Sequence, residues 1–362
     1  MSNAHDLSRY KKNNQPITIT HVTKAVAKEA KLTFDDVLLL PQYSTIESRN
    51  NVDLTNNLDS DIRLKIPIIS SPMDTITEVK MASAMSAVGG LGIIHRYNTI
   101  EEQAAMVRKV SGLVGAAIGI TGDFEERSAA LYDAGARVLC LDVAHGHHVL
   151  MERALKTLKD TYGRDVHLMA GNVATLGGFN DLADWGADSI RCGIGGGSIC
   201  TTRIQTGHGV PGFETILECA KSDRDAKIII DGGIKSSGDI VKALAAGADF
   251  VMLGSLVAGT TETPGQVITY TDGSKRKAYR GMASKKAQEA WRGKSSSPEG
   301  IATTVHYKGS VINILEDLVG GIKSGCSYSG VSNLKELRTN SIFLRQSSAS
   351  KHESSPHILA RG

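Results

Sequence analysis

The sequence has 362 residues, of which 41% are hydrophobic and 22% charged, and its formal net charge is +3. This is the composition of an ordinary globular chain, and a near-neutral charge without a long basic run argues against a surface for nucleic acid or anionic membrane. The five cysteines are widely spaced without a C-x-x-C pair, which argues against a disulfide framework or a zinc site and favours a reducing, cytoplasmic location.

The N-terminal stretch, residues 1–30, is polar and lacks the apolar segment of a signal peptide. No run of about 18 apolar residues, the length a membrane helix needs, occurs anywhere in the chain. We therefore expect an N-terminal arm over 1–30, no secretion and no membrane span.

Short apolar runs then alternate with helical patterns. Amphipathic stretches such as 125–136 and 237–248 have apolar residues at three- and four-residue spacing, as helices do. Three units share a phrase, "DAGARVLCLD", "DWGADSIRCG" and "AAGADFVMLG", which indicates an internal repeat. There are eight apolar runs: 66–70, 91–95, 115–119, 137–143, 166–172, 188–194, 227–233 and 249–255.

Runs that are apolar on both faces are typical of parallel strands covered by helices, so the pattern predicts a single (β/α)8 TIM barrel over residues 31–345. A doubly wound sheet is the weaker alternative. Its dinucleotide fingerprint needs G-x-G-x-x-G after the first strand, whereas "GIGGGS" lacks the last glycine and follows the sixth.

Two segments break the repeat. Residues 256–310 form a long insertion after the eighth run, of a length that is usually mobile or functional, and we expect a lid there. The basic stretch 274–277 is expected at a solvated hairpin tip rather than on nucleic acid. Residues 346–362 are polar and serine-rich, which predicts a C-terminal tail outside the core.

Catalytic residues of such barrels follow the strands, which directs attention to "CGIGGGSICTTR", residues 192–203. Cys200 lies there in a glycine-rich turn, whose backbone N–H groups can stabilise a thiolate. It is either a nucleophile or an incidental cysteine in a connection. Cys140 and Cys192 fall within predicted strands and are expected in the core.

Anion binding is predicted in the loops after the seventh and eighth strands, where barrels commonly hold phosphate. These loops are "DGGIKS" (231–236) and "GSLVAG" (254–259), unless their glycines merely turn the chain. Asp231 would then accept hydrogen bonds from a sugar. The histidines of "DVAHGHH" (142–148) lack a complete ligand set nearby, so we interpret them as solvated or core-edge residues rather than metal ligands.

Taken together, these motifs resemble the IMP dehydrogenase/GMP reductase family over about residues 30–345. Such enzymes are (β/α)8 barrels, usually tetrameric, that act on a purine nucleotide with a nicotinamide cofactor. The matching motifs occur in family order: "LTFDDVLLLP" (32–41), "SSPMDTITE" (70–78), "GGLGIIHR" (89–96), "MAGNV" (169–173), "GGGSICTTR" (195–203), "DGGI" (231–234), "YRGM" (279–282) and "EG" (299–300).

The resemblance implies that Cys200 forms a covalent thioimidate at C2 of the purine, while Thr202 and Glu299 handle protons there. It implies cofactor contacts from Asp142, Ala144, Gly193 and Gly195. It also implies a potassium ion held by the carbonyls of Gly195, Gly197 and Cys200, with Glu353 of the tail. The implied substrate contacts are Met73, Ser198, Asp231, Gly233, Gly254, Ser255, Tyr279, Gly281 and Met282.

Two activities remain open. "SIC", "SPMDTITE", "YRGM", "PEG" and the "HESSPH" tail resemble a dehydrogenase, which oxidises IMP to XMP with NAD and uses an Arg-Tyr pair on a flap to activate water. The stretch Ala283 to Pro298 is shorter than such a flap and contains Arg292 but no tyrosine, and "GCSYSG" (325–330) resembles a reductase. The expectation is therefore an NADPH-dependent GMP reductase, a homotetramer lacking the regulatory CBS pair, with IMP dehydrogenase as the alternative.

Overall fold

The computed structural model describes residues 30–354, so the predicted N-terminal arm lies almost entirely outside the described residues. The helices and strands of the described residues belong to one compact unit, which begins at Leu32. Between residues 30 and 354, every helix is too short or too polar to span a bilayer.

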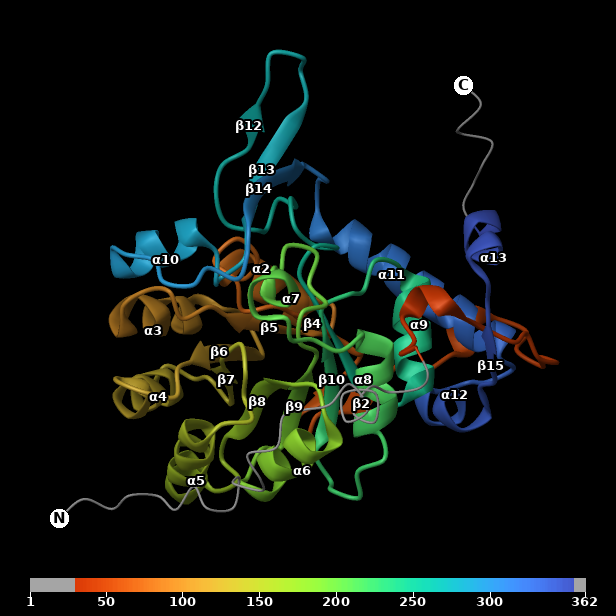
Figure 1. The fold of residues 1–362 in the computed structure, drawn as a ribbon, viewed down its shortest axis with the longest axis horizontal. Helices are drawn as coiled ribbons and strands as arrows, with labels where there is room; N and C mark the ends of the chain where they lie inside the picture. Colours follow the sequence, from red (N-terminus) through yellow and green to blue (C-terminus); the bar gives the residue numbers. More distant parts are fainter. Residues whose placement is uncertain (1–29, 355–362) are drawn as a thin grey trace, which may run out of the picture. The chain divides into compact units, whose positions relative to one another are not determined.

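Eight parallel strands close into a barrel, which confirms the predicted (β/α)8 fold (Figure 1). The last strand pairs with the first, with Val251 opposite Ile68, and this pairing closes the sheet. Every predicted apolar run overlaps one strand. In chain order the strands are β4 (Ile68–Ser70), β5 (Leu91–Ile94), β6 (Val114–Ile118), β7 (Val138–Asp142), β8 (His167–Val173), β9 (Ser189–Cys192), β10 (Lys227–Asp231) and β11 (Phe250–Leu253).

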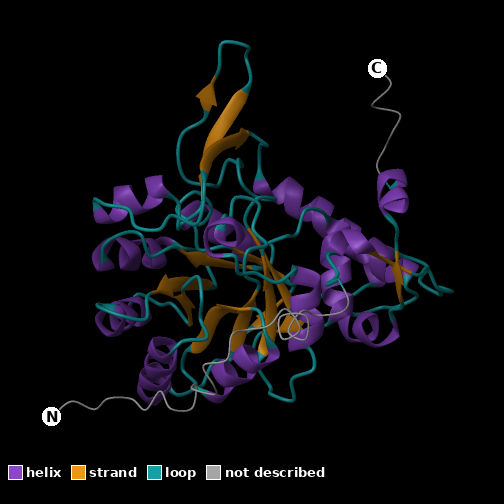
Figure 2. Cartoon of the chain, viewed as in Figure 1, coloured by secondary structure: helices purple, strands orange, loops and turns teal. Residues whose placement is uncertain are grey.

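Helices follow the strands and cover the outside of the barrel (Figure 2). Several begin with a side-chain cap. In α3, Thr99 and Glu102 form a reciprocal capping box, which satisfies backbone N–H groups at the helix start. The helices are α2 (Val79–Ala87), α3 (Ile100–Lys109), α4 (Phe124–Asp133), α5 (Val149–Tyr162), α6 (Leu176–Asp184), α7 (Thr202–Thr206), α8 (Gly212–Cys219), α9 (Ser237–Ala246), α11 (Val311–Tyr328) and α12 (Leu334–Asn340).

Side chains along each strand alternate between two apolar clusters, as the period of two in a strand requires. In β7, Val138 and Cys140 belong to the cluster inside the barrel, whereas Leu139 and Leu141 pack with the helices. The short hairpin of β2 (Asn56–Asn57) and β3 (Arg63–Leu64) adds the buried Leu58 and Leu64 to the inner cluster. The barrel is therefore filled from its N-terminal end, and its open mouth lies at the C-terminal ends of the strands.

The predicted insertion is an ordered antiparallel sheet. Its strands are β12 (Ile268–Thr269), β13 (Lys275–Arg280) and β14 (Ala302–His306), with helix α10 (Lys285–Arg292) between the last two. The placing of 274–277 at a solvated tip is wrong in one respect. Lys277 lies within β13 and is buried. Its ammonium can be buried because it donates to the carbonyls of Thr260 at 3.0 Å and Thr263 at 2.5 Å.

The two ends of the described chain meet beside the barrel. Strand β1 (Val37–Leu39) pairs antiparallel with β15 (Phe343–Arg345), and the predicted tail begins with an ordered helix, α13 (Ser348–Glu353). This helix packs near the 3-10 helix η2 (Phe34–Asp36), while a second 3-10 helix, η3 (Arg49–Asn51), packs against α11. The residues of α13 are largely exposed, as expected for a segment outside the core.

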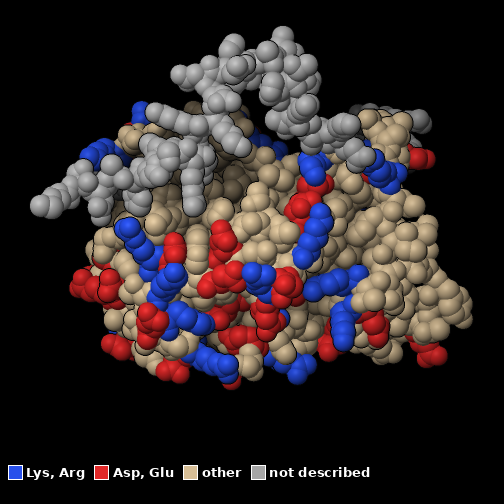
Figure 3. All heavy atoms as spheres, turned by 60° about the horizontal axis from the view of Figure 1, so that its bottom comes forward, with Lys and Arg blue, Asp and Glu red and all other residues tan. Residues whose placement is uncertain are grey.

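Charged side chains of both signs are intermixed on the face shown in Figure 3. Ion pairs such as Lys159 with Asp188 and Arg224 with Asp184 join neighbouring segments of the surface. This mixture agrees with the small net charge of +3.

Candidate active site

A pocket of about 450 Å³ opens at the C-terminal end of the barrel. Loops after six of the eight strands line it together with the insertion, and β8 contributes Asn172 from within the strand. Every residue predicted to act in catalysis, substrate binding or cofactor binding lies in this lining, which brings together positions from Met73 to Glu299. Their individual roles remain predictions.

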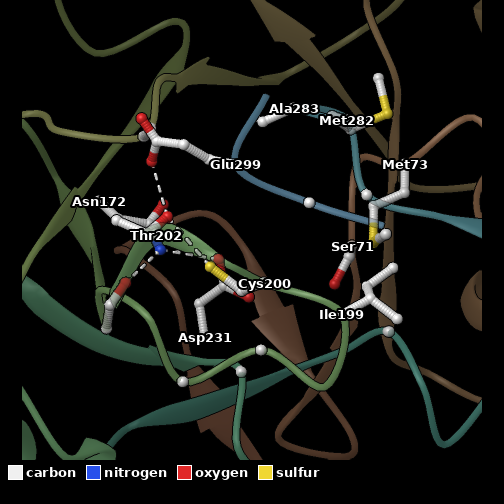
Figure 4. Close-up of a pocket in the computed structure, with 18 of the residues that line it drawn as sticks. Ser71, Met73, Asn172, Ile199, Cys200, Thr202, Asp231, Met282, Ala283 and Glu299 are labelled. Carbon is white, nitrogen blue, oxygen red and sulfur yellow. Dashed lines mark hydrogen bonds between the residues drawn. The ribbon is translucent and has the colours of Figure 1, made fainter. Parts of the chain in front are cut away.

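Cys200, Thr202 and Glu299 form a hydrogen-bonded row across the pocket (Figure 4). The Cys200 thiol lies 3.1 Å from the Thr202 hydroxyl, which donates to a Glu299 carboxylate oxygen at 2.7 Å. A backbone contact brings the two segments together, because the N–H of Thr201 donates to the carbonyl of Glu299 at 2.9 Å. A proton leaving the thiol therefore has a path through the hydroxyl to the carboxylate.

Cys200 is half-buried in the pocket, whereas the other four cysteines are buried, which confirms the core positions of Cys140 and Cys192. Burial raises the pKa of the Cys140 thiol to about 12 and that of Cys326 to about 11. Thiols of this kind are poor nucleophiles near neutral pH, since the thiolate is the reactive form. The accessible thiol of the pocket is that of Cys200.

Small and hydroxyl residues gather on the side of the pocket predicted to bind phosphate. Ser198 and Tyr279 approach to 3.4 Å between their hydroxyl oxygens, and a Cβ at Gly254 would lie 3.3 Å from the Tyr279 hydroxyl. Burial raises the pKa of Tyr279, while its contact with Ser198 opposes this rise only in part. Its hydroxyl therefore stays protonated at neutral pH and can donate. Gly233 and Ser255 complete this side.

A buried arginine links two of the predicted carboxylates. Arg191, in β9, contacts Asp142 at 2.5 Å and Asp231 at 2.7 Å. Burial disfavours its charge, but Asp231 and Asp142 hold the pKa of Arg191 well above its ordinary value. Asn172 donates to Asp231 and to the Gly193 carbonyl, both at 2.9 Å. This network fixes the Asp231 carboxylate at the edge of the pocket.

Arg191 and Asn172 carry no role in the predictions from sequence. Arg191 falls within the apolar run 188–194. A charged residue inside a buried strand needs a partner of opposite charge, and this is the signal that could have pointed to a role for Arg191. Asn172 and Arg96 stand within quoted motifs, "MAGNV" and "GGLGIIHR", without an assigned role. Gln288, in the insertion, also lines the pocket and has no signal in the sequence.

The side predicted to bind the nicotinamide cofactor holds an unpartnered polar atom. Arg96 donates from Nη2 to the Asp142 carbonyl at 3.1 Å, while its buried Nε has no hydrogen-bond partner and lies 3.9 Å from the Asp142 carboxylate. Ala144, Gly193 and Gly195 add small residues to the same lining. Arg96 itself lines the pocket, and a guanidinium has five N–H donors that can meet the polar groups of a bound cofactor.

The predicted potassium ligands are only partly brought together. Gly195, Gly197 and Cys200 share the pocket loop, and the Gly197 carbonyl already accepts the Cys200 N–H at 3.1 Å. A carbonyl has two lone pairs, so this use leaves capacity for a cation. Glu353 does not line the pocket and is exposed on α13. Residues 30–354 contain no cluster of three or more His, Cys, Asp or Glu arranged to hold a metal.

Comparison with known proteins gives consistent matches. The family model "IMP dehydrogenase / GMP reductase domain" matches residues 31–357. An inosine-5'-monophosphate dehydrogenase of Nitrosopumilus maritimus is 35% identical, covering 90% of this chain and 98% of that protein. A GMP reductase of Leishmania major is 33% identical, covering 91% and 97%. The structure of an alanine variant of GMP reductase from Trypanosoma brucei in complex with guanosine 5'-monophosphate superposes with a TM-score of 0.88 at 31% identity, covering 93% and 99%.

Proposed function

The chain belongs to the IMP dehydrogenase/GMP reductase family, and from this premise we propose that it is an NADPH-dependent GMP reductase, which converts GMP to IMP and ammonia. Proteins of both names match at similar identity, so the choice between the activities depends on the pocket itself. The purine nucleotide and the cysteine chemistry are common to both.

The lid segment, defined as residues 283–298, carries the proposal. It contains no tyrosine and one arginine. Among the lid residues whose side chains the structure describes, Ala283 and Gln288 line the pocket, and neither side chain is a base. Hydrolysis of a thioimidate needs a group that deprotonates water near neutral pH within hydrogen-bond reach. Expulsion of ammonia needs only proton delivery, which Thr202 and Glu299 can supply.

In the proposed reaction the Cys200 thiolate adds to C2 of GMP, and the bond between C2 and the exocyclic amino nitrogen then breaks. Ammonia leaves with a proton delivered through Thr202 from Glu299, and a thioimidate remains on Cys200. NADPH, when bound, supplies the hydride that reduces C2. The C2–S bond then breaks, which regenerates the Cys200 thiolate and releases IMP.

Other residues hold the nucleotide in this proposal. Asp231, fixed by Arg191 and Asn172, accepts hydrogen bonds from ribose hydroxyls. The phosphate is bound by Ser198, Gly233, Gly254, Ser255 and Tyr279, while Met73, Gly281 and Met282 contact the base.

The remaining parts of the proposal concern the cofactor, the cation and the assembly. Asp142, Ala144, Gly193 and Gly195 would hold the nicotinamide end of NADPH, beside the unpartnered Nε of Arg96. The carbonyls of the Cys200 loop would bind potassium together with Glu353 from the tail of a neighbouring subunit, because Glu353 of the same chain lies outside the pocket. We propose a cytoplasmic homotetramer, in line with the unpaired cysteines and the family resemblance.

IMP dehydrogenase is the second candidate, and one observation favours it. Arg96 and Tyr97 both line the pocket, and the Arg96 Nε is buried without a partner. In a dehydrogenase this arginine and tyrosine would be the pair that activates water for hydrolysis of the thioimidate, because both side chains border the cavity that holds Cys200. NAD would then be the cofactor and XMP the product.

The two activities are separated by assaying purified protein with GMP plus NADPH and, in parallel, with IMP plus NAD. We expect ammonia and IMP from the first mixture, and XMP from the second at least about a hundredfold more slowly, because one missing catalytic base typically costs that much. Cys200→Ser should still bind GMP but lose nearly all turnover in either assay. Faster formation of XMP than consumption of GMP would contradict the reductase proposal and favour the second candidate.

A further inference from the structure

Gln288 joins the two ends of the lid segment. It lies in α10 and is only 7% exposed, although most of that helix is at the surface. Its side-chain amide donates to the Ala283 carbonyl at 3.1 Å, and its oxygen accepts the Ser296 N–H at 2.8 Å. One side chain therefore satisfies backbone groups at the beginning and near the end of the lid.

The Ala283 carbonyl connects Gln288 to Glu299. The Ala283 carbonyl also accepts the backbone N–H of Glu299 at 3.0 Å, so both residues converge on one atom. Figure 4 shows Ala283 and Glu299 in the upper part of the view, with Thr202 below Glu299. The Glu299 carboxylate in turn reaches Thr202 at 2.7 Å. A chain of contacts thus runs from Gln288 through the lid backbone to the proton path of Cys200.

A second contact fixes the far end of α10 to the barrel. The Trp291 ring stacks on Tyr97, with 6.0 Å between ring centroids and 19° between planes. Tyr97 also donates from its hydroxyl to the Met282 carbonyl at 3.0 Å. The lid helix is held near its middle by Gln288 and near its C-terminal end by an aromatic pair, and this pair supplies a fluorescent reporter of its position.

We propose that Gln288 is a positioning residue that holds the lid in the conformation that keeps the Glu299 carboxylate on the Thr202 hydroxyl. The proposal rests on the proposed function, because it concerns the proton path of that reaction. Gln288 does not take part in proton transfer. It acts by closing the loop that carries Glu299, and its loss lets that carboxylate move away from Thr202.

The test compares Gln288→Leu, which removes both hydrogen bonds at similar volume, with Glu289→Gln as a matched control. Glu289 is the next residue of the same helix, and its side chain is 45% exposed in a loose pair with Lys285. We expect kcat with GMP and NADPH to fall about 10- to 100-fold in Gln288→Leu, the cost of a misplacement near 1 Å. The KM for GMP should change little, because the phosphate and ribose contacts lie elsewhere. Glu289→Gln should match wild type.

A double-mutant cycle with Glu299→Gln tests whether Gln288 acts through Glu299. If it does, Gln288→Leu should reduce kcat little further once Glu299 is replaced, because the effects share one path. Independent, multiplicative effects would overturn the proposal. So would a wild-type kcat in Gln288→Leu, or a loss confined to the KM for GMP.

Tryptophan fluorescence tests the position of the lid helix independently of the reaction rates. In a Trp185→Phe background Trp291 is the remaining tryptophan of the two in the sequence. Gln288→Leu should shift its emission to longer wavelength as the lid loosens, with an unchanged thermal midpoint of the barrel. An unshifted spectrum would count against the proposal. Failure of the proposed function is seen separately, as wild-type protein that does not consume GMP; the cycle is then run with IMP and NAD, since Thr202 and Glu299 serve that reaction too.

Discussion

Cys200 differs from the other cysteines in its surroundings rather than in its type. Four thiols are buried and that of Cys200 is half-buried in the pocket. We expect iodoacetamide to alkylate Cys200 first in the folded protein, because burial raises the pKa of thiols such as Cys140 and keeps the reagent out. Peptide mapping by mass spectrometry identifies the modified residue.

Bound GMP should slow this alkylation, since its purine would cover the thiol. A control in denaturant should label all five cysteines. Modification of Cys140 or Cys326 at the rate of Cys200, or a rate unaffected by saturating GMP, would contradict the assignment of Cys200 as the nucleophile.

For single residues, the sequence predicts which positions lie in the site better than it predicts which side chains interact there. The glycines and the cysteine of 192–203 are recognisable because their types are unusual together. The pairing of Arg191 with Asp142 and Asp231 is not recognisable, because the carboxylates lie on other strands, 49 and 40 residues away. Likewise, the partners of Gln288 are backbone atoms, which carry no residue-specific signal.

Among the elements, the ends of β9 and β10 meet closely at Gly193. This residue has a φ of +141°, and a Cβ there would lie 2.4 Å from the Asp231 carbonyl oxygen. Gly193→Ala should therefore push the end of β10 away and displace the Asp231 carboxylate from Arg191. We expect a large loss of GMP affinity and destabilisation by more than about 1 kcal/mol, as for alanine at an incompatible φ. Ligand titration and thermal unfolding measure the two effects.

Gly135→Ala is the matched control for this substitution. Gly135 also has a positive φ, +108°, but nothing lies within 4 Å of its Cβ position. This variant should share the backbone strain and keep normal GMP affinity. Equal affinities in the two variants would show that the close approach at Gly193 does not shape the ribose site.

The elements themselves are predictable where local pattern decides them. All eight barrel strands can be recognised because each is a short apolar run, and Cβ atoms on both faces are buried. The sheet of the insertion cannot, because its strands are short and polar and depend on pairing with each other. The burial of Lys277 follows from two carbonyls in the preceding loop, a contact that composition alone does not reveal.

At the scale of the whole molecule, residues distant in sequence are joined around Asp35. Its carboxylate accepts hydrogen bonds from Lys235 and from Lys351, which are 200 and 316 residues away. Gln346 adds a bond from its backbone N–H to the Asp36 carbonyl at 2.9 Å. The start of the barrel chain, the loop after β10 and the tail helix α13 thus meet at one carboxylate.

We expect the docking of α13 to depend on pH through this meeting point. Hydrogen bonds hold the pKa of Asp35 below its ordinary value, the one from Lys235 having the larger effect and the one from Lys351 the smaller. Asp35 in turn raises the pKa of Lys351. A carboxyl with a lowered pKa stabilises the fold above its unfolded pKa, about 3.9, and this contribution is lost as pH falls through the folded value. An amine with a raised pKa stabilises below its unfolded pKa, about 10.4, and this contribution is lost as pH rises through the folded value. The coupling is therefore full between these limits.

A double-mutant cycle of Asp35→Asn and Lys351→Met, followed by thermal unfolding, measures that coupling directly. We expect a stabilising interaction at neutral pH that vanishes as the solution is acidified below the ordinary pKa of an aspartate, because the protonated carboxyl no longer attracts the ammonium. High salt should weaken it as well, since both side chains are partly exposed: 31% of Asp35 and 55% of Lys351. A coupling that is absent at neutral pH, or that persists unchanged in acid, would mean that the tail helix is held by its backbone and apolar contacts and not by this pair of charges.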